Sequence, residues 1–226
     1  MHNIFLIPGY GIPKNILEDE NYNFYLKLAF NKIYNFVAES TPAETLIICC
    51  GGKTDMIKPY KRTEADEMNK FFAELIKQKP FLAPITKNWV FISEKESLST
   101  LENLINSKKI IEKQKIKNAR IFIFCEQTRE KRIKTLAKKI FSSAHNIKII
   151  AIDFDLSSNR YLSPEFLAKK EKANLKHLLW AMQSPENLKK HRELLIEKIN
   201  YLRKAGPKAH TDAVKKWWEQ KLKELD

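Results

Sequence analysis

Two pairs of glycines follow apolar runs of the chain, at points where backbone amides could approach a ligand closely. Gly9 and Gly11 come after the first run, and Gly51 and Gly52 come after the second. A glycine has no side chain, so a ligand can reach its amide directly. Neither pair has the spacing of a dinucleotide-binding G-x-G-x-x-G loop or of a Walker A loop. The glycines therefore predict backbone access to a ligand, with an ordinary turn as the alternative.

Two glutamates, Glu64 and Glu96, are the candidates for acid–base chemistry. Each follows an apolar run and stands at or just before the start of a helical pattern. A carboxylate in such a place can exchange a proton with a ligand or accept hydrogen bonds from ribose hydroxyls. For Glu64 the alternative is structural, because an acidic residue in the first helical turn complements the helix dipole.

Three hydrogen-bonding side chains recur after the third apolar run at intervals of three residues: Ser97, Thr100 and Asn103. At that spacing they can face one way on the first helical turn and orient a polar ligand. Ser99 and Glu102, which lie among them, have the spacing of a capping box, so these two are explained structurally. Ser97 is not a candidate nucleophile, because no histidine base is near in the pattern.

Two arginines, Arg129 and Arg132, follow the fourth apolar run, in the first turn of a predicted helix with Thr128 as its expected N-cap. Cations at a helix start oppose the helix dipole by roughly 0.3–1 kcal/mol each. Helix amides and guanidinium groups together suit a phosphate or a carboxylate. The segment therefore predicts an anion-binding site, with a solvated basic face as the alternative.

Five apolar, β-branched runs must position these segments. The runs are nearly continuous, as in strands that are buried on both faces of a sheet. Helical stripes lie between them, and strict alternation predicts parallel strands joined by right-handed crossovers. The runs are Ile4–Ile7, Leu46–Cys50, Trp89–Ile92, Ile121–Cys125 and Ile147–Ile152. We expect an α/β, Rossmann-like, doubly wound sheet of about five strands, which binds ligands outside the carboxyl ends of its strands.

The end of the chain changes character, so we expect two domains, residues 1–156 and 157–226. Ser163 and Ser184 each precede a proline, which is typical of a capping residue followed by the first helical position. Gly206, also followed by proline, is expected to end a helix. The second domain is predicted to be an all-helical extension that packs on the α/β core.

The order of these motifs resembles the YdcF/SanA/ElyC-like family, a Rossmann-like domain of unknown function. The family pattern is a strand-end glycine pair, then Ser-Glu-Ala, then a Glu-x-x-Ser-x-x-Thr-x-x-Asn-like spacing, and then a His-x-x-Arg helix start. The matching residues are Gly51-Gly52, Thr63-Glu64-Ala65, Glu96-Ser97 with Thr100 and Asn103, and Thr128 with Arg132. The similarity covers roughly residues 2–155. It implies the sheet order 3-2-1-4-5.

Two residues depart from the family pattern. Thr63 stands where the family has serine, and Arg129 stands where it has histidine. Arginine stays protonated in proteins and cannot exchange a proton as histidine does. The resemblance therefore implies a site that favours anion binding over proton transfer at this position.

The net charge of +14 bears on the choice of partners. Residues 1–156 and 157–226 each carry +7, so the tail is about twice as basic per residue. This charge suits an anionic ligand, a nucleic acid or an acidic membrane surface, and it also suits solubility alone. With no apolar run near the ~18 residues of a membrane span and no basic leader, a cytoplasmic location is expected. The three cysteines are interpreted as small buried residues, and the five scattered histidines predict no metal site.

The leading functional hypothesis is the binding of an anionic small molecule, either phosphorylated or nucleotide-like, for which S-adenosylmethionine is one candidate. Catalysis and the oligomeric state stay open. A second hypothesis is nucleic-acid binding, with Trp217 and Trp218 as stacking platforms. It is less expected, because the basic residues are dispersed and no nucleic-acid-binding motif is present. A third is an interaction protein whose helical tail binds a partner or a second copy.

Overall fold

The computed structural model describes residues 2–40, 44–141, 143–153 and 163–225. The chain divides into two compact units. The first comprises residues 1–55 and 61–154, and the second comprises residues 56–60 and 155–226.

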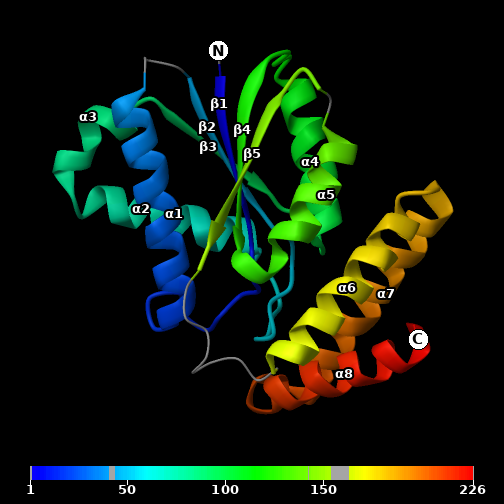
Figure 1. Ribbon diagram of the computed structural model, residues 1–226. Helices are drawn as coiled ribbons and strands as arrows, with labels where there is room; N and C mark the ends of the chain where they lie inside the picture. The colour runs from blue at the N-terminus through cyan, green and yellow to red at the C-terminus, as the bar shows by residue number, and fades with distance from the viewer. Residues whose placement is uncertain (1, 41–43, 142, 154–162, 226) are drawn as a thin grey trace. The chain divides into compact units, whose positions relative to one another are not determined.

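The first unit is built on a five-stranded parallel sheet. Its strands are β1 (His2–Pro8), β2 (Thr45–Cys50), β3 (Trp89–Glu94), β4 (Ala119–Glu126) and β5 (Asn146–Ile152). They pair in the order β3-β2-β1-β4-β5, and every pair is parallel (Figure 1). Each strand contains one of the five apolar runs of the sequence. The predicted doubly wound fold and strand order are therefore confirmed.

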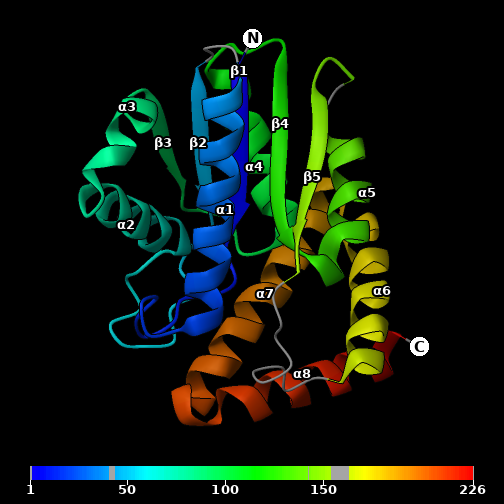
Figure 2. The ribbon, with the colours of Figure 1, turned by 60° about the vertical axis from the view of Figure 1, so that its left-hand side comes forward.

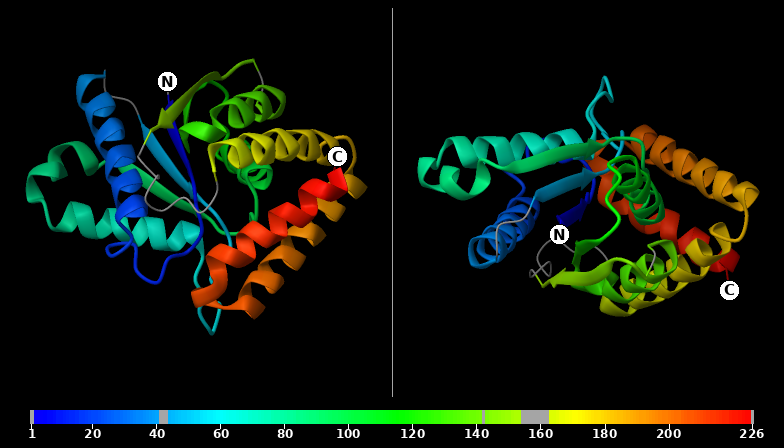
Figure 3. Two further views of the ribbon diagram at one scale, coloured as in Figure 1. Left: turned by 60° about the horizontal axis from the view of Figure 1, so that its bottom comes forward. Right: turned by 90° about the horizontal axis from the view of Figure 1, so that it is seen from above.

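Four long helices cover the sheet: α1 (Glu20–Glu39), α2 (Glu64–Lys77), α4 (Thr100–Lys113) and α5 (Glu130–Ile140). The first two lie on one face and the last two on the other, as the views along and across the strands show (Figures 1 and 3). A short turn η1 (Pro80–Leu82) and the four-residue helix α3 (Ala83–Thr86) precede β3. These two were not predicted, because so short a segment has no amphipathic period.

The core lies on both faces of the sheet around β1 and β2. Every residue of β2 is buried, and so is β1 from Asn3 onward. Aromatic rings fill one side, where the Phe5 ring stacks on that of Phe122 with centroids 4.9 Å apart. All three cysteines are free and buried in strands, as predicted. Continuous apolar runs are thus explained by burial on both faces.

The strand register places the starts of the predicted polar segments side by side at the carboxyl edge of the sheet. Cys50 pairs with both Pro8 and Glu94, so the segments after β1, β2 and β3 begin side by side. Ser99 caps α4 by accepting from the amide of Glu102 at 3.2 Å. The Glu102 carboxylate in turn accepts at 2.6 Å from the amide of Leu98, the residue before the cap, so Ser99 and Glu102 both satisfy amides at this helix start.

The second unit is helical wherever the structure describes it after residue 162. Its elements are α6 (Pro164–Ala181), α7 (Pro185–Ala205), the short turn η3 (Pro207–Ala209) and α8 (His210–Leu225). Each long helix packs on the other two (Figure 2). Ser163 and Ser184 cap the first two helices as predicted, and Gly206, with φ +80°, ends α7. The expected packing of this unit on the α/β core stays a prediction.

Within the described ranges, the structure contains no helix with the length and apolar character that a membrane crossing requires.

Candidate functional site at the carboxyl edge of the sheet

Glu64, the first residue of α2, has its carboxylate buried at the carboxyl edge of the sheet. Only 7% of the residue is exposed. The carboxylate accepts hydrogen bonds from the Thr54 hydroxyl and the Gly11 amide. Burial raises the pKa of Glu64, and these two hydrogen bonds and the nearby charge of Arg129 offset that effect only in part. A carboxyl group in this state can gain or lose a proton closer to neutral pH than an exposed one.

Two glycines make room for this carboxylate. A Cβ atom on Gly9 would lie 1.9 Å from Glu64 Oε2, and one on Gly51 would lie 2.6 Å from Glu64 Cβ. Their amides donate to the carbonyls of Cys50 and Glu94, at 2.8 and 2.9 Å. These glycines were expected to give a ligand access to the backbone. In the structure, the close approach that they permit is made by Glu64 itself.

The other two glycines also use their amides inside the protein. Gly52 donates to the Ser97 carbonyl at 2.7 Å, which joins the segment after β2 to the segment after β3. A Cβ on Gly52 would lie 2.8 Å from that same carbonyl oxygen. Gly11 has φ +109° with open space around its Cβ position, and its amide donates to Glu64. The glycines therefore shape the loops, and a ligand must be held mainly by side chains.

Glu94, at the end of β3, is a buried carboxylate that the sequence analysis missed. It accepts from the amides of Glu96 and Ser97 at 2.9 and 3.1 Å, and from the side-chain amide of Asn106 at 3.1 Å. The Ser97 hydroxyl also bonds to it. The predicted acid–base candidate Glu96 is instead exposed. The bend after β3 turns Glu94 inward, and the apolar pattern alone could not distinguish the two glutamates.

The polar side chains of the third segment are brought together and joined to the fourth. The Ser97 hydroxyl forms a hydrogen bond with the side-chain oxygen of Asn103, and both residues are buried. Arg132, in the first turn of α5, is also buried, and its Nη1 donates to Thr100 Oγ1 at 3.4 Å. Glu64, Asn103 and Arg132 thus lie at the same carboxyl edge of the sheet, whereas Glu96 is exposed.

The segment after β4 begins differently from the prediction. Glu126, not Thr128, is the capping residue, and it caps a short 3₁₀ turn, η2 (Gln127–Arg129). Its carboxylate accepts from the amide of Thr128 at 3.2 Å and from the Thr128 hydroxyl. The α-helix α5 therefore starts only at Glu130. A strand-end carboxylate that reaches the amide two residues on competes successfully with threonine for the capping position.

Arg129 lies over an aromatic ring from the segment after β1. Its guanidinium carbon is 4.0 Å from the centre of the Tyr10 ring, a cation–π contact. Arg129 Nε is also 4.0 Å from Glu126 Oε2, and the Glu126 amide donates to the Tyr10 hydroxyl. Tyr10 was not predicted as a site residue, although its place between Gly9 and Gly11 was a signal. It connects the predicted anion-binding segment to the loop that contacts Glu64.

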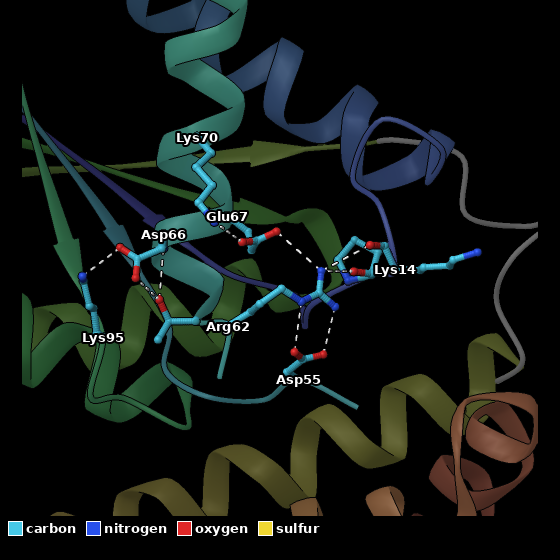
Figure 4. A network of polar contacts seen from close by, with 9 residues as sticks. Lys14, Asp55, Arg62, Asp66, Glu67, Lys70 and Lys95 are labelled. Atoms are coloured by element: carbon cyan, nitrogen blue, oxygen red, sulfur yellow. Dashed lines mark hydrogen bonds and ion pairs between the residues drawn. The ribbon is translucent and has the colours of Figure 1, made fainter. Parts of the chain in front are cut away.

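A third arginine, Arg62, joins the loops around Glu64. Arg62 donates to both oxygens of Asp55, at 2.9 and 3.0 Å, and to the Pro13 and Lys14 carbonyls, at 3.1 and 3.2 Å (Figure 4). It also lies 3.5 Å from a Glu67 carboxylate oxygen. The forked contact with buried Asp55 lies within the loop after β2. The bonds to the Pro13 and Lys14 carbonyls join this loop to the one after β1. Arg62 therefore links the two loops that contact Glu64.

The described residues contain no group of three or more histidine, cysteine, aspartate or glutamate side chains arranged to hold a metal ion. A surface hollow of about 630 Å³ lies at the amino ends of the strands, between residues such as His2, Glu44 and Asn88. It is at the opposite edge of the sheet from the polar residues described above, so it is no part of the candidate site.

The tryptophans proposed as stacking platforms are covered within the helical unit. Trp217 is buried, with its ring 5.5 Å from that of Tyr201. The amines of Lys170 and Lys198 lie over the Trp218 ring at 5.4 and 5.0 Å. The expectation that both rings serve as stacking platforms is wrong for Trp217, because its side chain is buried.

Comparisons of the chain with models of known families, with curated proteins and with solved structures found no match.

Proposed function

We propose that this chain is a YdcF/SanA-like protein that binds a phosphorylated or nucleotide-like small molecule at the carboxyl edge of its sheet. The proposal is carried by Arg129 and Arg132, which follow one strand and contact the segments after two others. Arg129 lies on Tyr10, and Arg132 donates to Thr100. Guanidinium groups bind phosphate oxygens through paired N–H donors, and here aromatic and hydroxyl contacts orient them in advance.

The carboxylates at this edge do not argue against an anionic ligand. Glu94 and Glu126 accept hydrogen bonds from nearby backbone amides and hydroxyls, which spread their negative charge. Glu64 is buried, and burial favours its neutral form. The segment after β4 therefore supports binding of an anion beside a carboxyl group that can carry a proton.

Glu64 is the better supported of the two acid–base candidates. It is buried among Gly9, Gly11 and Gly51, whereas Glu96 is exposed. Any proton transfer to or from the ligand is assigned to Glu64 within this proposal. The cytoplasmic location expected from the sequence belongs to the same proposal.

A ligand-dependent melting screen tests the proposal directly. The full chain is heated with inorganic phosphate, sulfate, nucleotides, sugar phosphates and S-adenosylmethionine in turn, at constant ionic strength. A ligand that binds the native state raises the midpoint by mass action. We expect at least one phosphorylated or nucleotide-like compound to raise it in a saturable way. Midpoints that respond to none of these compounds would overturn the proposal.

A further inference from the structure

Glu64 and Arg129 both contact one short segment, residues 9–11. Glu64 accepts from the Gly11 amide and lies against the Cβ position of Gly9. Tyr10, between these glycines, supports Arg129 on its ring at 4.0 Å. The charge of Arg129 acts on the Glu64 carboxyl, so an anion bound by Arg129 changes the charge that this carboxyl experiences.

Arg129 supplies positive charge to a buried carboxyl group. Glu64 has two hydrogen-bond donors, Thr54 and Gly11, and its charge is favoured further by Arg129 and opposed by Glu94. Tyr22 of α1 and Cys50 of β2 also interact electrostatically with Glu64, and Glu126 Oε2 lies 4.0 Å from Arg129 Nε. A buried carboxylate stays ionised only while such partners compensate for its lost hydration.

An anion on Arg129 changes this balance in one direction. The ligand neutralises the arginine's charge, and it also adds negative charge beside Glu64. Both effects disfavour the ionised carboxylate.

We propose that binding of a phosphate-like dianion at Arg129 is coupled to the uptake of one proton by Glu64. This inference rests on the proposed function, because it requires the anion to bind at Arg129. It goes further by making the site a proton-linked one, in which the bound ligand lies beside a neutral carboxylic acid that can donate a hydrogen bond.

The linkage fixes the sign of the pH dependence. Above the pKa of Glu64 in the complex, the carboxylate is ionised with and without ligand, and the anion binds weakly. Below the pKa of the free protein, Glu64 is neutral in both states, and the anion binds tightly. Between these two limits, affinity rises by up to about tenfold for each pH unit of acidification.

Sulfate is the probe that tests the coupling, because it remains a dianion across the whole range from about pH 5 to 8. Its Kd for the full chain is measured by NMR titration at several pH values and constant ionic strength. Calorimetry in buffers of different ionisation enthalpy counts the protons taken up. We expect the Kd for sulfate to decrease as the pH is lowered. We expect proton uptake to approach one proton per bound sulfate.

Two matched variants locate the proton. Glu64→Gln keeps the shape of the side chain but cannot ionise, so its sulfate affinity should be high and independent of pH. Glu44→Gln makes the same change at an exposed residue of the amino edge and should behave as the native chain does. If Glu64→Gln does not fold, the proton count of the native chain still decides the question.

The possible failures are distinguishable. Sulfate that binds near Arg129 without proton uptake would overturn the coupling and leave the proposed function standing. Sulfate affinity that increases with rising pH would also contradict the coupling. Absence of sulfate binding at any pH would remove the anion site itself, and with it both proposals.

Discussion

The two units of the chain use their charged and polar residues in different ways. In the α/β unit, many buried polar side chains gather at the carboxyl edge of the sheet, among them Glu64, Glu94, Ser97, Asn103 and Arg132. In the described part of the helical unit, His191 is the one residue of this kind. The helical unit carries as much net charge as the first 156 residues, yet it keeps its lysines and arginines at the surface or on aromatic rings.

The contrast indicates which charges report on function. A buried charge costs free energy unless it is paired or hydrogen-bonded, so its presence needs a compensating reason. Several buried charges of the first unit lie at one edge, where the segments after β1, β2, β3 and β4 meet. The surface charges of the helical unit remain in contact with water and incur no such cost. Net charge alone could not separate these cases, whereas burial does.

The largest predicted loss of stability concerns the two neighbouring tryptophans of α8, one buried and one partly exposed. Trp217→Ala should destabilise the helical unit by about 3–5 kcal/mol, because it removes a buried aromatic side chain. Trp218→Ala should cost clearly less, since that ring is partly exposed beneath lysine amines. Urea unfolding monitored by circular dichroism checks the difference. Equal losses for the two variants would contradict the assigned interior of this unit.

A glycine in each unit provides the next comparison. Gly51→Ala should destabilise the α/β unit by about 2–4 kcal/mol, because it combines φ +146° with a Cβ placed 2.6 Å from Glu64 Cβ. Gly206→Ala, at φ +80° with no atom within 4 Å of its Cβ, should cost only about 1 kcal/mol. Thermal unfolding measures both. If the Gly51 variant is no less stable than the Gly206 variant, the tight packing around Glu64 is wrong.

Much of the fold could be predicted from patterns that act locally. The apolar runs located all five strands, and capping serines located the starts of α4, α6 and α7. The strict alternation of strands and helices then specified a parallel sheet. These features depend on residues near one another in the chain, which is why a single sequence contains them.

The site was less predictable, because its details depend on loop paths. Glu94 and Glu96 look equivalent in the sequence, and only the bend after β3 makes one buried and the other exposed. Gly51 could be identified as special, but not the side chain that approaches it. Tyr10 and Arg129 are more than a hundred residues apart, so no local pattern could pair them.

The buried histidine of the helical unit predicts a loss of stability in acid. His191 Nδ1 lies 3.0 Å from His177 Nε2, and burial lowers the pKa of His191 to about 4. Below pH ~6.5 the unfolded chain takes up a proton that the folded unit resists. Stability should therefore fall as the pH drops from about 6.5 to about 4, by up to about 3 kcal/mol.

Urea unfolding at several pH values, followed by tryptophan fluorescence, measures this effect, because three of the four tryptophans belong to the helical unit. In the His191→Gln variant, the free energy of unfolding should no longer fall between about pH 6.5 and 4. His145→Gln serves as the matched control and should leave that fall in place. A native profile that is flat between about pH 4 and 6.5 would refute the assignment of His191 as a buried, neutral residue.

The most direct test of the anion site compares two arginines at opposite ends of β4. Arg129 follows the strand and lies 4.0 Å from the Tyr10 ring centre, whereas Arg120 lies near its start, 5.1 Å from that of Phe36. Sulfate affinity is measured for the native chain, Arg129→Gln and Arg120→Gln at one pH and ionic strength. The free energy of unfolding should change by less than about 1 kcal/mol in the Arg129 variant. The variant loses the cation–π contact with Tyr10, but it also loses an unfavourable positive charge at the helix start, and these two effects offset each other. Its affinity for sulfate should fall by about 1.5–3 kcal/mol, or roughly 10- to 150-fold, while Arg120→Gln binds as the native chain does. Equal affinity in all three proteins would contradict an anion site at the carboxyl edge of the sheet.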